Sequence, residues 1–112
     1  MRVLDLHRLG ELRSISYHQE IASRIAADPR LQAAARERVD GWIESGRVAR
    51  PYALEWRRLL AGPVSELQRE LADPCERMTV LRSCSPFAGA LDSRTRWRLF
   101  REVRRELEVS AH

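Results

Sequence analysis

The chemistry that this sequence offers is concentrated in arginine side chains near its C-terminus. Four of them recur at intervals of four, three and four residues: Arg94, Arg98, Arg101 and Arg105. In a helix this spacing gathers them into one ridge about 16 Å long, opposite an apolar face that includes Leu99 and Val103. Like charges at this spacing repel each other, so the arginine ridge indicates a negative partner. Guanidinium groups bind carboxylate or phosphate through paired hydrogen bonds.

Acidic side chains of the same chain offer another explanation for the arginine ridge. A set with helical spacing lies earlier in the sequence: Glu66, Glu70 and Asp73. This set could pair with the ridge within one molecule or between copies in a homo-oligomer, although exposed ion pairs stabilise a fold by only about 0–1 kcal/mol each. A solvated face without a partner is a further alternative. The sequence leaves these alternatives open.

Among outside partners, an acidic protein is favoured over nucleic acid. All 20 basic residues are arginine, which is typical of biased codon usage, and against 16 Asp+Glu they give a net charge of only +4. Only Trp97 offers a ring for stacking beside the ridge. The helix–turn–helix pattern over 29–61 is a weak signal, because its turn is long and Glu55 interrupts the basic residues of its second helix.

The irregular stretch 83–89, SCSPFAG, is the second distinctive feature. Phe87 could plug the end of a helical core, or it could anchor a partner with Arg82 and Arg96 as polar neighbours. Arg96 is expected on the buried side of the last helix. An unpaired buried guanidinium is very costly, so Arg96 would need a carboxylate, loop carbonyls or a partner there.

Catalytic and metal-binding patterns are missing from the sequence. No H-x-x-x-H, H-E-x-x-H or C-x-x-C motif occurs, and no glycine-rich phosphate loop. His18 lies on an apolar stripe and is expected to be a hydrogen-bonded, half-buried residue. Cys75 and Cys84 are nine residues apart, which turns them to opposite sides of a continuous helix. We therefore expect no enzyme activity, no cofactor and no metal.

Turn and capping signals divide the chain into helical segments. Asp28-Pro29 and Asp73-Pro74 are helix starts with a capping carboxylate and a proline, and no run alternates with period two. The pattern predicts an all-α protein, a compact bundle of five or six short helices with a long C-terminal helix. Residues 1–12 are expected to be an arm or short helix broken at Gly10, and 13–112 a single domain. The expected helices are 16–28, 29–45, 51–61, 64–72, 74–83 and 93–109.

Length and composition agree with a small globular domain. The 112 residues are 44% hydrophobic and 32% charged, which suits a folded chain with one modest core. No apolar run approaches the roughly 20 residues of a membrane span, and no secretory hydrophobic region opens the chain. Two cysteines are too few for a disulfide scaffold. A cytoplasmic protein is expected.

The sequence also resembles a family of short bacterial proteins of unassigned mechanism, over about residues 13–105. The resemblance rests on Arg13-Ser14, His18, Tyr52, Trp56, Leu81, Arg82, the run Ser85 to Gly89, Leu91 and Arg96-Trp97. That family is associated with antitoxin-like partners of toxin–antitoxin operons. The resemblance therefore implies a neutralising protein–protein interaction, with no catalytic residue to carry over. One departure is that many antitoxins have a disordered toxin-binding tail, and none of obvious length occurs here.

Taken together, these patterns predict a non-enzymatic, antitoxin-like binding module that neutralises or regulates an acidic partner protein. The residues expected to contact the partner are Arg82, Phe87, Arg94, Arg96, Trp97, Arg98, Arg101 and Arg105. One alternative is a small DNA- or RNA-binding regulator that uses the arginine ridge. The other is a self-assembling structural protein.

Overall fold

The computed structural model describes residues 6–110, and over this range the chain is helical without any strand. Its helices are α1 (Leu6–Ile25), α2 (Pro29–Ser45), α3 (Arg50–Ala61), α4 (Val64–Ala72), α5 (Glu76–Ser83) and α6 (Ser93–Ser110). The predicted all-α class is confirmed, and so is the long C-terminal helix.

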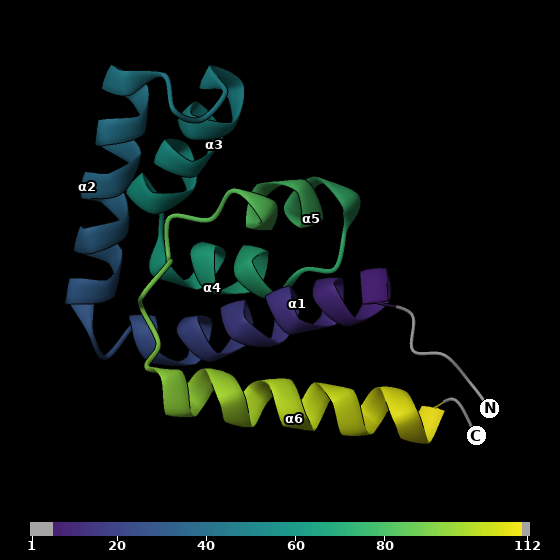
Figure 1. Cartoon of the computed structure of the whole chain (residues 1–112). Coiled ribbons are helices and arrows are strands. Elements are labelled where there is room, and N and C mark those ends of the chain that lie inside the picture. Colours follow the sequence, from purple (N-terminus) through teal and green to yellow (C-terminus); the bar gives the residue numbers. More distant parts are fainter. Residues whose placement is uncertain (1–5, 111–112) are drawn as a thin grey trace.

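Helix α1 is the element around which the others are arranged (Figure 1). It lies between α4 and α6, and it also contacts α5 and α2. Helices α2 and α3 pack against each other at one end of the molecule, which measures 48 × 30 × 23 Å. Helix α6 packs on α1 at the edge of the bundle, so most of its circumference is exposed.

The helix boundaries of α2 follow the local signals in the sequence. The Asp28 carboxylate accepts a hydrogen bond from the Arg30 backbone N–H, and Pro29 occupies the first helical position. Gly46 ends the helix in the left-handed region at φ 69°, where a side chain would be strained. These short-range signals account for a helix that was predicted correctly at both ends.

The start of α1 differs from the prediction. The helix begins at Leu6 and runs through Gly10, so the predicted boundary between residues 12 and 13 lies inside one helix. A glycine within a helix is unfavourable by roughly 0.5–1 kcal/mol, and the burial of Leu9 beside it offsets this. Residues 1–5 of the expected arm lie outside the described range.

The core is formed by residues of α1, α2, α3, α4 and α5 and of the loop that follows α5. Trp56 and Phe87 are its largest fully buried side chains, and their rings meet edge to face with centroids 6.0 Å apart. The Trp56 indole N–H donates to the Leu81 carbonyl at 3.1 Å, which satisfies the polar end of a buried ring.

Candidate functional site

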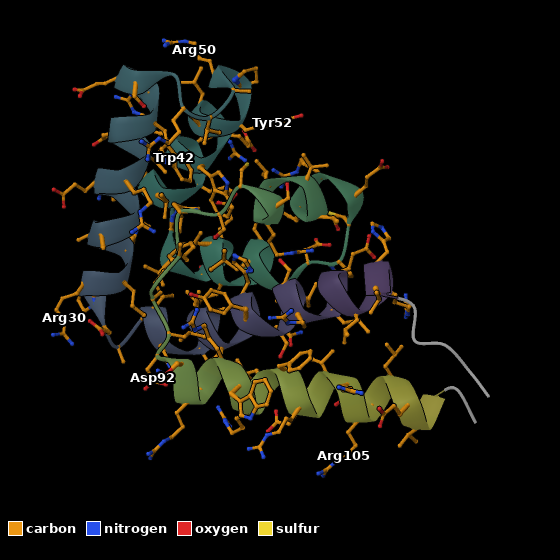
Figure 2. The ribbon with its side chains drawn as sticks, viewed as in Figure 1. Arg30, Trp42, Arg50, Tyr52, Asp92 and Arg105 are labelled. Atoms are coloured by element: carbon orange, nitrogen blue, oxygen red, sulfur yellow. The ribbon has the colours of Figure 1, made fainter. Side chains whose placement is uncertain are left out.

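The arginine ridge lies on the outward face of α6, as its spacing predicts. All four of its side chains are exposed, while Val103 on the opposite face is buried against the bundle. Figure 2 shows Arg105 projecting from α6 away from the rest of the protein. The ridge is therefore an open surface of the fold.

Most of the ridge has no carboxylate partner within the described residues. Arg98 is the exception, because its guanidinium lies 3.1 Å from Glu20 on α1 and 3.9 Å from Glu102. Arg94, Arg101 and Arg105 form no ion pair within residues 6–110. Three of the four positive charges are left available to another molecule.

The acidic set that could have neutralised the ridge is engaged elsewhere. Glu66 lies 3.9 Å from Arg58, Glu70 pairs with Arg77, and the Asp73 carboxylate accepts from the Cys75 backbone N–H at 2.9 Å. These residues lie on or just after α4, which is on the other side of α1 from α6 (Figure 1). The arrangement of the helices excludes this pairing within one molecule.

An exposed aromatic cluster borders the ridge. Trp97 is 58% exposed, and its ring centroid lies 5.5 Å from that of Phe100. The guanidinium carbon of Arg13, on α1, lies 4.6 Å from the Phe100 centroid, a cation–π contact that connects the two helices. A rigid ring beside positive charge is typical of the central residues of protein interfaces.

The other flank of α6 is acidic. Glu20, Glu102 and Glu106 line a hollow between α1 and α6. Burial opposes ionisation of Glu20, but hydrogen bonds from Arg24, Ser23 and Arg98 hold its pKa below the ordinary value. The ridge is consequently a narrow positive strip with carboxylates along one side.

Phe87 does not lie on this surface. It is 2% exposed, and its ring packs against Trp56 and also against His18, at a centroid distance of 6.3 Å. Of the two alternatives for the loop, the structure shows the core plug. The prediction that Phe87 anchors a partner is corrected, because its ring has no accessible face in this fold.

The environments of Arg82 and Arg96 differ from the predictions: Arg82 is buried and Arg96 is exposed. Arg82 is 4% exposed, and its Nη1 donates to the carbonyls of Leu71, at 3.2 Å, and Asp73, at 2.6 Å. It therefore joins α5 to the end of α4, and little of its side chain is accessible to a partner. Arg96 lies on the side of α6 that faces α1, yet its side chain is exposed. At this first turn of α6 the seam with α1 is hollow, so the guanidinium reaches solvent.

His18 is hydrogen-bonded as expected, but it is buried and not half-buried, and the sequence did not predict its partners. Its Nδ1 lies 2.6 Å from the Ser14 carbonyl, and its Nε2 lies 2.7 Å from the Ser85 hydroxyl. A carbonyl only accepts, so Nδ1 carries the proton and Nε2 accepts from Ser85. Burial, with a smaller contribution from the charge of Arg82, lowers the pKa of His18 from 6.5 to about 4. The imidazole is therefore neutral near pH 7.

The hydrogen bonds around His18 and Ser85 help to hold the loop 84–91 in place. The Ser85 hydroxyl accepts from the Phe87 backbone N–H at 3.1 Å, and the Tyr17 hydroxyl donates to the Phe87 carbonyl at 2.7 Å. From α2, Arg38 donates to the Ala88 carbonyl at 2.7 Å. His18 and Ser85 are 67 positions apart, so no local pattern could have predicted their contact.

The described residues contain no cluster of three or more His, Cys, Asp or Glu side chains placed to hold a metal ion. None of the described helices combines the length and apolarity that crossing a membrane requires. Cys75 and Cys84 are both free thiols.

Comparison with known proteins returns no match for this chain among protein-family models, curated proteins or solved structures.

Proposed function

We propose that this protein is a helical binding module that uses the outward face of α6 against an acidic surface of a partner protein, and that it neutralises or regulates this partner as an antitoxin does. The observation that carries the proposal is the open ridge. Three arginines that form no ion pair within residues 6–110 lie beside the exposed ring of Trp97 on one accessible helix. An acidic surface would supply the missing counter-charges, and Trp97 would supply apolar contact area.

The carboxylates beside the ridge favour a protein partner over nucleic acid. Glu20, Glu102 and Glu106 would repel a phosphate backbone that spreads beyond a strip one helix wide. A protein surface can present carboxylates to the ridge and neutral or basic groups to this acidic flank. Electrostatic complementarity of this mixed kind sets specificity and the rate of association.

The antitoxin role is supported by the resemblance over about residues 13–105. Burial distinguishes the residues of this resemblance that stabilise the fold from those that are accessible to a partner. The central residues of that resemblance, Arg82 and Phe87, are buried and hold the loop and α5 in place. They build the scaffold, and contact with the partner falls to α6. Co-expression tests this role, because an antitoxin restores growth to cells that produce its toxic partner.

The direct test is recovery of the partner on the tagged protein from its native host, after nuclease treatment. The R101E/R105E variant reverses two ridge charges, and the R36E/R47E variant reverses two exposed charges outside α6 and serves as the matched control. We expect the wild type and the control to retain one stoichiometric protein, and R101E/R105E to lose it by at least about tenfold. Equal recovery on both variants would refute the role of the ridge.

A second candidate function, nucleic-acid binding, is favoured by one observation. The exposed ring of Trp97 lies beside guanidinium groups, as in stacking platforms for single strands. Anisotropy measurements with labelled DNA and RNA at several salt concentrations distinguish the two functions. Tight binding that weakens steeply with salt and is lost in R101E/R105E would replace the protein-binding proposal.

A further inference from the structure

A hollow of about 300 Å³ opens in the seam between α1 and α6, beside the Trp97–Phe100 ring pair. We propose that it binds a small organic anion, a carboxylate or phosphate carried on an aromatic or other apolar body. The site is separate from the arginine ridge, because none of the four ridge arginines lines it. It does not depend on the proposed protein partner.

The charges around the hollow favour an anion. Arg13 and Arg96 line it from the two helices, and no aspartate or glutamate of the described part of the chain does. Neither guanidinium forms an ion pair within residues 6–110. The hollow on the other flank of α6 has the opposite character, because its lining includes Glu20, Glu102 and Glu106. The two openings of one seam therefore differ in sign, and an anion is attracted to the first alone.

The hydrogen-bond donors that remain free in the hollow suit a carboxylate or phosphate. His18 is neutral and both of its ring nitrogens are engaged, and the Tyr17 hydroxyl donates to a backbone carbonyl. The Ser14 hydroxyl and the guanidinium groups of Arg13 and Arg96 form no hydrogen bond within the described residues. Paired N–H groups of arginine match the two oxygens of a carboxylate or phosphate.

The shape of the hollow selects an apolar body for the ligand. Leu99 and Phe100 form part of its lining, and its volume is at the small end of ligand pockets. Stacking on Phe100 holds the Arg13 guanidinium at 4.6 Å from the ring centroid. A donor that is already held in position loses less conformational freedom on binding, which improves the affinity for a small ligand.

The test is to titrate the full chain with phenyl phosphate and with benzoate and to measure the changes in amide chemical shift by NMR. Inorganic phosphate and phenol serve as comparison ligands that lack the apolar body or the charge. We expect saturable shifts at Gly10, Ser14 and Phe100 in the millimolar range with at least one aryl anion. The aryl anion that binds with the higher affinity shows whether the site prefers a carboxylate or a phosphate. Phenol should give no saturable shift, and inorganic phosphate should bind at least about tenfold more weakly.

Two variants of equal charge make the test specific. R13Q/R96Q removes the guanidinium groups of the hollow, and R101Q/R105Q removes two from the ridge; all four side chains are exposed, so the helical circular dichroism signal should not change. We expect R13Q/R96Q to weaken aryl-anion binding by at least about tenfold and R101Q/R105Q to leave it within about twofold. The site is refuted by equal weakening in both variants, by unchanged binding in R13Q/R96Q, or by no saturable shift with either aryl anion.

Discussion

Replacing Phe87 by alanine removes a ring that is 2% exposed and packs against the rings of Trp56 and His18. The side chains of Tyr17, Arg38 and Ser85 hold this segment of the loop through hydrogen bonds to its backbone. None of these bonds uses the Phe87 side chain, so the substitution leaves them in place. The change in stability therefore reports the packing of this one ring.

The expected size of the effect follows from burial. Full burial of a phenylalanine side chain contributes about 1.5–3 kcal/mol, and the cavity left by truncation raises the loss for Phe→Ala to about 3–5 kcal/mol. A domain of this size has a free energy of unfolding of about 5–15 kcal/mol, so F87A should lose about a fifth of it or more. The melting temperature should fall by roughly 10 °C or more.

Urea titration monitored by far-ultraviolet circular dichroism measures this loss. Circular dichroism is preferred to tryptophan fluorescence because Trp56 contacts the Phe87 ring, so the substitution itself would alter its emission. F87L, which refills most of the space, should lose less than about 1.5 kcal/mol. W97A, which truncates a 58% exposed ring on α6, should stay within about 0.5 kcal/mol of the wild type. A loss below about 1 kcal/mol in F87A, or a larger loss in W97A than in F87A, would show that Phe87 is not the plug of the core.

Other predictions concern buried polar groups and thiols. Replacing Arg82 by methionine leaves two helix-end carbonyls without their donor, and we expect urea titration to show a loss of about 2–4 kcal/mol; unchanged stability would contradict the role of this guanidinium. The depressed pKa of His18 means that the unfolded chain binds a proton first as the pH falls. Its contribution to stability is therefore complete above about pH 6.5 and falls by about 3 kcal/mol by about pH 4. Urea titrations across this range should show a steeper decline in the wild type than in H18Q, and parallel declines would contradict the assignment. The exposed thiol of Cys75 should react with iodoacetamide faster than that of Cys84, because burial raises the pKa of the Cys84 thiol; equal rates by peptide mass spectrometry would contradict this.

The helices and the arginine ridge could be predicted from the sequence because their causes are local. A capping carboxylate at Asp28, a proline at the first helical position and a glycine at Gly46 act within one or two turns of α2. The position of the ridge follows from a rotation of 100° per residue, whatever the rest of the fold does. Both features hold in the structure.

The environments of single side chains could not be predicted in this way. The sequence correctly placed Arg96 on the side of α6 that faces α1. Helical periodicity does not tell whether the neighbouring helix fills the space opposite a side chain, and opposite Arg96 a hollow remains. Arg82 looked available for a partner, yet the end of α4 supplies two carbonyls that accept from it. Helix α1 continues through Gly10, a residue that opposes helix formation locally.

By itself, the sequence determined which segments are helices, where most of them end and which face of the last one is positive, because each of these depends on residues within a few positions of one another. Only the tertiary structure decided that His18 meets Ser85, that Phe87 closes the core and that the ridge is not covered by the acidic residues of α4. These contacts join residues far apart in the chain. They arise from the packing of all the helices together, a sum of many weak interactions that no short stretch of sequence encodes.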